Sequence, residues 1–78
     1  MMYPFMELDD HTVITHSEMK ENGRVKVYIE RPIRLGFQSV TCWLPEYEWV
    51  GNDGFSDEEL KYFDDFVHSL AHIIIELS

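Results

Sequence analysis

The segment that decides the fold of this chain is SDEELKYFDDFVHSLAHIIIEL, residues 56–77. It opens with a capping box, in which Ser56 accepts a hydrogen bond from the amide of Glu59 and the Glu59 side chain reaches back. The acids at 57–59 place negative charge at the positive end of the helix dipole. No Gly or Pro interrupts the residues that follow. We therefore predict an α-helix of about 20 residues, which is about 30 Å long.

The predicted helix is more apolar than a small sheet requires. One stripe follows spacings of three and four, and the apolar surface extends to both sides of it, over an arc of about 200°. A helix that covers a sheet needs little more than about 100°. The rest must be covered by the Trp43–Val50 segment, by the N-terminal strand or by a second protomer, and exposed apolar patches of this kind often mark interfaces. The stripe is Leu60, Phe63, Val67, Leu70, Ile74 and Leu77, with Tyr62, Phe66 and Ile73 on one flank and Ala71 and Ile75 on the other.

An aromatic and acidic segment, WLPEYEW at 43–49, precedes the helix. Trp and Tyr are favoured at protein interfaces because they join a large apolar area to a polar group. Packing of this segment over the start of the helix is an equal alternative. The predicted interface residues are Tyr62, Phe66, Ile73, Trp43 and Trp49.

The first half of the chain reads as short β-strands. Four runs rich in β-branched and aromatic residues are separated by turn signals such as Asn22-Gly23. Consecutive strands with short connections pair antiparallel. We therefore predict a single α+β domain over residues 1–78, an antiparallel β-meander of three to four strands packed against one long C-terminal α-helix. The four runs are Tyr3–Leu8, Thr12–Lys20, Val25–Arg31 and Phe37–Leu44.

The register around Asn22-Gly23 decides which side chains face the core. A two-residue loop pairs Glu21 with Arg24, and a three-residue loop pairs Glu21 with Val25. Burial of the alternating apolar residues favours the second register, which places His16 opposite Glu30 on the exposed face. In the following strand we assign Cys42 and its alternating neighbours to the core and Trp43 to the outer face.

Composition narrows the functional classes. The net charge of −9, from 15 acids and six bases, disfavours nucleic-acid binding, which depends on neutralising phosphates. It favours solubility and suits a basic protein partner. The single cysteine precludes an intrachain disulfide and fits a reducing compartment. Residues 1–5 lack the basic and apolar pattern of a secretory signal, so we expect none here, and the longest apolar run, Ile73–Ile75, is far too short for a membrane span. We expect a cytoplasmic protein that is not bound to membranes.

Few residues carry a candidate chemistry. His68, His72 and Glu76 lie at i, i+4 and i+8, a spacing at which histidines can share a zinc ion, although a solvated helical face is the favoured alternative. A His16–Glu30 couple suits acid–base catalysis only in a cleft. Cys42 more closely fits a core residue than a nucleophile. We predict no catalytic residue and no cofactor.

Three motifs, VYIER at 27–31, CWL at 42–44 and GFSDEEL at 54–60, resemble a family of small bacterial domains of unknown function. Genes of that family often lie beside antitoxin-like partners, so the resemblance implies partner binding or a toxin–antitoxin role. Members of that family usually carry a P-H-x-H stretch on the strand that corresponds to Val25–Ile29. The two histidine positions of this stretch fall on Lys26 and Tyr28 here, so no role of those histidines is carried over. We predict a non-catalytic protein-interaction module that self-associates. The alternatives are a component of a toxin–antitoxin pair and a small metal-binding or hydrolytic enzyme.

Overall fold

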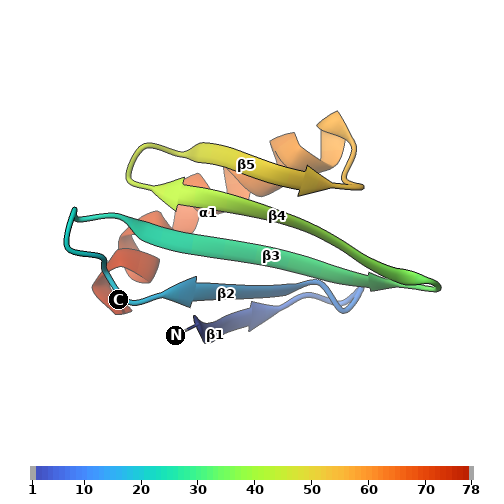
Figure 1. Cartoon of the computed structure of the whole chain (residues 1–78), viewed down its shortest axis with the longest axis horizontal. Coiled ribbons are helices and arrows are strands. Elements are labelled where there is room, and N and C mark those ends of the chain that lie inside the picture. The colour runs from blue at the N-terminus through green and yellow to red at the C-terminus, as the bar shows by residue number, and fades with distance from the viewer. Residues whose placement is uncertain (1, 78) are drawn as a thin grey trace.

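Within residues 2–77, five antiparallel strands form one sheet in chain order, and one helix lies across one face of this sheet (Figure 1). The computed structural model describes residues 2–77. The predicted α+β meander with a C-terminal helix is confirmed, but the predicted number of strands, three to four, is too low. The elements are β1 (Met2–Glu7), β2 (Val13–Ser17), β3 (Val25–Ile33), β4 (Gly36–Leu44), β5 (Glu48–Asp53) and α1 (Asp57–Leu77).

The strand missing from the sequence prediction is β5, which pairs with β4 at one edge of the sheet. Its residues are mostly exposed, so it lacks the apolar alternation that identifies a half-buried strand. The register shifts between Ser39 and Thr41, and β5 carries the extra residue of this bulge. Gly51 lies there with φ of +66°, a conformation that glycine adopts without a steric penalty.

The core lies between α1 and the two longest strands, β3 and β4. Val25, Val27 and Ile29 alternate along β3 toward the helix, and all three are buried. Cys42, with Val40 and Leu44 beside it, is buried in the same way on β4, as predicted. Trp43 pairs with Lys26 in the register between these residues, so it lies on the outer face of the sheet, also as predicted.

The predicted pairing between β2 and β3 is wrong. Val27 lies opposite His16, and Val13, not His16, lies opposite Glu30. β2 ends at Ser17, and the Ser17 hydroxyl accepts a hydrogen bond of 3.0 Å from the amide of Lys26. This contact interrupts the ladder before the turn at Gly23, where Lys20 accepts a hydrogen bond from the Gly23 amide. The prediction assumed that β2 and β3 pair without interruption from the turn onward. A one-residue irregularity in this pairing moves every side chain beyond it to the opposite face of the sheet.

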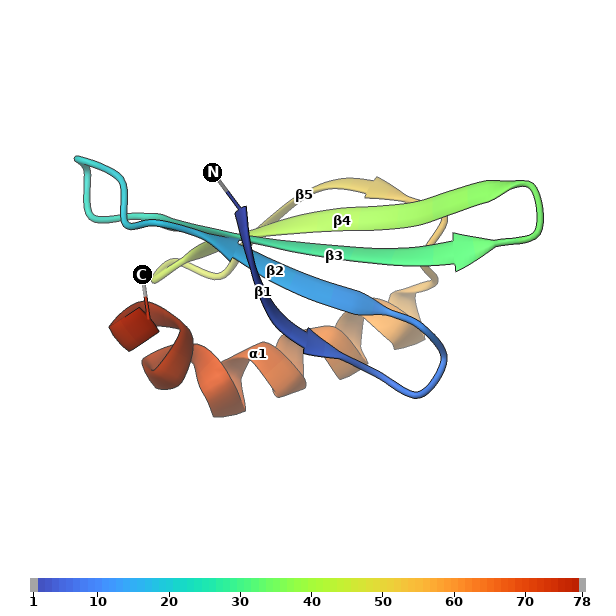
Figure 2. The ribbon, with the colours of Figure 1, turned by 90° about the horizontal axis from the view of Figure 1, so that it is seen from below.

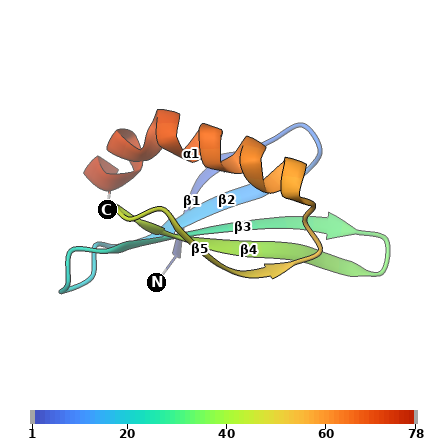
Figure 3. The ribbon, with the colours of Figure 1, turned by 90° about the horizontal axis from the view of Figure 1, so that it is seen from above.

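The helix begins as predicted and packs along the sheet (Figures 2 and 3). The Ser56 hydroxyl accepts from the Glu59 amide at 3.2 Å, and Glu59 Oε1 accepts from the Ser56 amide at 3.1 Å. Phe63, Val67 and Ile74 of the predicted stripe are buried, whereas Leu77 is exposed. Among residues 2–77, no helix combines the length and the apolar character needed to cross a membrane.

Candidate functional site

The predicted interface residues on the helix share one flank, which we call the helix flank: Tyr62, Phe66 and Ile73. The side chain of Tyr62 is 57% exposed and that of Ile73 is 37% exposed. Phe66 is half-buried and packs against the core, with its ring 6.3 Å from that of Tyr62. The helix flank is therefore an accessible apolar surface, and its least exposed member also supports the fold.

The two tryptophans lie elsewhere and do not join this surface. Trp49 packs against the core from β5, and its indole Nε1 donates a 2.9 Å hydrogen bond to Asp64 on the β5 side of the helix. Trp43 lies on the outer face of the sheet, with the Arg24 guanidinium carbon 4.8 Å from its ring centroid. The sequence prediction grouped these residues by composition, and the register separates them.

The residues predicted to bind zinc are not brought together as a metal site. In the part of the chain that the structure describes, no group of three or more His, Cys, Asp or Glu side chains is arranged to hold a metal ion. His68 stacks on Tyr47, with ring centroids 3.6 Å apart and planes 6° apart. Its Nδ1 lies 2.7 Å from the Asp64 carbonyl oxygen. His72 and Glu76 remain on the exposed face of the helix.

The two remaining candidates for chemistry are buried within the fold. His16 lies on the core face, 5.7 Å from the ring of Tyr3 and 6.4 Å from that of Phe5, rather than beside Glu30. Burial raises the pKa of the Cys42 thiol to about 12, with a smaller contribution from the charge of Asp64. A thiol with such a pKa is almost entirely protonated at neutral pH and is a poor nucleophile.

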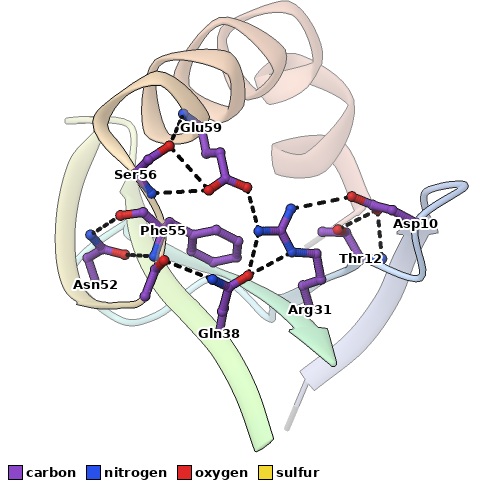
Figure 4. Close-up of polar contacts among 9 residues, drawn as sticks. Asp10, Thr12, Arg31, Gln38, Asn52, Phe55, Ser56 and Glu59 are labelled. Atoms are coloured by element: carbon purple, nitrogen blue, oxygen red, sulfur yellow. Dashed lines mark hydrogen bonds and ion pairs between the residues drawn. The ribbon is translucent and has the colours of Figure 1, made fainter. Parts of the chain in front are cut away.

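An arginine that the sequence analysis did not single out organises one end of the molecule (Figure 4). Arg31 Nη2 lies 2.5 Å from Glu59 Oε2, and its Nη1 lies 3.4 Å from Asp10 Oδ2. The guanidinium also donates to the Gln38 side chain and lies 5.1 Å from the ring centroid of Phe55. Arg31 thus connects the β1–β2 loop, β3, β4 and the start of α1.

These contacts favour the charged forms of both carboxylates. The pKa of Glu59 is lowered, first by the hydrogen bond from the Ser56 amide and then by Arg31. The pKa of Asp10 is lowered, first by the hydrogen bond from the Thr12 hydroxyl, with Arg31 contributing less. In the sequence, the only signal for this network was the capping box. It identified Glu59 but not its ion-pair partner Arg31 on β3.

A pocket of about 520 Å³ lies beside this network, between the β1–β2 loop and the first turns of the helix. We call it the acidic pocket. Its apolar wall is made of Leu8, Tyr62 and Phe63, and Arg31 lines it from β3. Tyr62 thereby joins the acidic pocket to the helix flank. The acids around the pocket are Glu7, Asp9, Asp10, Glu58 and Glu59.

A second exposed apolar feature is the turn between β3 and β4, which we call the hairpin tip (residues 32–37). Leu35 is 94% exposed, Phe37 is 61% exposed and Ile33 is 48% exposed. The hairpin extends beyond the neighbouring strands (Figure 1). Apolar side chains clustered at a projecting turn differ from the scattered exposed residues that occur on any surface.

No family model, no curated protein and no solved structure matches this chain. The resemblance to the bacterial family of small domains therefore stays a prediction. The fold and the surfaces described above define an α+β sheet-and-helix domain with exposed apolar features.

Proposed function

We propose that this chain is a non-catalytic protein-interaction module that self-associates through the helix flank. The observation that carries the proposal is the exposure of Tyr62 and Ile73 beside the buried stripe of the same helix. Burying apolar surface contributes about 25 cal/mol per Å², so such side chains favour association when a partner covers them.

The state of the candidate reactive groups supports a non-catalytic role. Cys42 and His16 are buried in the core, and the ring of His68 is stacked on Tyr47. General acid–base and nucleophilic catalysis both require such groups to reach a substrate. Cys42 and His16 are enclosed by the fold, and the half-exposed ring of His68 is held against Tyr47.

The test is the oligomeric state of purified protein by analytical ultracentrifugation over a range of concentrations. We expect a monomer–dimer equilibrium for the wild-type chain. Ile73→Glu places a charge on the helix flank and should shift the equilibrium toward monomer. Ile73 is a better position than Phe66, because Phe66 packs against the core and its substitution would also weaken the fold.

The matched control is His72→Glu, which adds a carboxylate one residue away on the exposed polar face of the same helix. This variant should self-associate like the wild type. A wild-type chain that stays monomeric at high micromolar concentration would contradict the proposal, as would equal association of both variants.

A further inference from the structure

We propose that the acidic pocket receives the hairpin tip of a second copy of this chain, so that two copies exchange tips about a two-fold axis. This inference rests on the proposed self-association and identifies the occupant of the pocket at the end of the helix flank. The shape, the apolar surfaces and the charges of the two features each support it.

The hairpin tip is a projecting apolar turn, a shape that suits insertion into a pocket. Leu35 stands at its end with 94% of its surface exposed, and Ile33 and Phe37 flank it on the two strands. Residues 31–38 contain two arginines and no acid, in a chain of net charge −9. Arg31 is already engaged by Glu59 and Asp10, whereas Arg34 makes no ion pair within residues 2–77. The tip therefore presents an apolar knob with one available positive charge.

The acidic pocket has the complementary form. Its volume of about 520 Å³ lies within the usual range for binding pockets, and its wall of Leu8, Tyr62 and Phe63 suits an apolar side chain. Asp9 and Glu58 on its rim make no ion pair with any residue that the structure describes. An incoming Arg34 would find carboxylates there that no internal cation already occupies.

The position of the two features permits a closed exchange. Arg31 lines the pocket and lies two residues before Ile33, so tip and pocket share one end of the molecule. The tip projects past the start of the helix and the β1–β2 loop (Figure 2). Since a two-fold interface repeats each contact, a rotation axis beside this end forms two tip-to-pocket contacts from one arrangement. Such closure gives a dimer rather than an open filament.

Reciprocal charge exchange tests this arrangement by ultracentrifugation in about 0.15 M salt, where long-range repulsion between the chains is screened. In the proposed dimer, Arg34→Glu places a negative charge opposite Glu58 of the other copy. Glu58→Arg places a positive charge opposite Arg34 of the other copy. Each variant alone should dissociate at least tenfold more readily than the wild type. An equal mixture of the two should dimerise again, because both contacts of the mixed dimer then join opposite charges. The double variant should also dimerise.

A second pair of variants tests the apolar contact. Leu35→Ser removes the apolar side chain at the end of the hairpin tip. Because Leu35 is 94% exposed, it makes almost no contact within its own chain. The fold should therefore be unchanged, while dimerisation weakens at least tenfold. Val50→Ser is the control, since Val50 is an exposed apolar residue on β5, away from the tip. Circular dichroism of each variant checks that the fold is retained.

The outcomes separate this inference from the proposed function. If the wild type dimerises and Ile73→Glu dissociates it, but Leu35→Ser does not, self-association stands and the tip-to-pocket contact is wrong. If the mixture of charge variants stays monomeric although each variant is folded, the contact is also wrong. A monomeric wild type contradicts both proposals.

Discussion

Burial changes the chemistry of the Cys42 thiol. It is buried on the core face of β4, and its pKa is raised to about 12 by burial. We predict that a thiol-reactive aromatic disulfide reacts with it very slowly in the native protein and rapidly in concentrated guanidinium, because only the thiolate attacks. The absorbance of the released thiol measures both rates. Rapid reaction of the native protein would contradict the burial and reopen a nucleophilic role.

Arg31 shows how one residue can decide the form of a site without a local sequence signal. Its partners Asp10, Gln38 and Glu59 come from three other parts of the chain. A guanidinium presents several donors in a fixed plane, so it can join these groups at once. Arg31 contacts the β1–β2 loop through Asp10 and the helix start through Glu59, and all three residues line the acidic pocket.

At the scale of elements, the helix start combines a local cap with a tertiary ion pair. The cap was predictable because Ser56 and Glu59 are three residues apart, a spacing that itself produces the reciprocal hydrogen bonds. The ion pair with Arg31 depends on the sheet below. Glu59 therefore stabilises the helix in two ways: its charge strengthens the capping hydrogen bond from the Ser56 amide, and the same charge is required for the ion pair with Arg31.

The contribution of the Glu59 charge to stability depends on pH. Glu59→Gln keeps a capping side chain but removes the charge. Because the pKa of Glu59 is lowered by folding, its charge stabilises the native state above the unfolded pKa of about 4.3 and ceases to do so as pH falls through the folded pKa. We expect the variant to be less stable by up to about 1 kcal/mol at neutral pH, since the side chain is partly exposed.

This difference should vanish in acid, once Glu59 is protonated in the wild type. Chemical denaturation of both proteins at several pH values measures it. Asp57→Asn is the control, because Asp57 lies in the same first turn of the helix but outside the acidic pocket, makes no ion pair within residues 2–77 and should show a smaller difference. A loss for Glu59→Gln that persists unchanged in acid would contradict the role of the charge.

At the scale of the whole molecule, a small domain of 78 residues buries only a modest core, so the proposed self-association would add noticeably to its stability. If the native chain dimerises and the unfolded chain does not, mass action raises the melting temperature with protein concentration. We expect a rise of a few °C for each tenfold increase, given the small unfolding entropy of such a domain. Differential scanning fluorimetry measures it, and Ile73→Glu should show a weaker dependence.

The features that depend on neighbouring residues could be predicted from the sequence. These are the capped helix, the alternation of β3 and β4, and the assignment of Cys42 to the core and Trp43 to the outer face. Each follows from a period or a short spacing, so the local chain carries the whole signal.

The features that join distant parts of the chain could not be predicted in this way and became clear from the three-dimensional arrangement. The ladder between β2 and β3 places His16 opposite Val27 on the core face and away from Glu30, and the Ser17 hydroxyl contacts the Lys26 amide where this ladder ends. β5 is held by pairing with β4 rather than by an apolar pattern of its own, and the acidic pocket needs the β1–β2 loop, β3 and α1 together. The physical reason is that side chains far apart in the sequence set these contacts, and no local spacing records which of them meet.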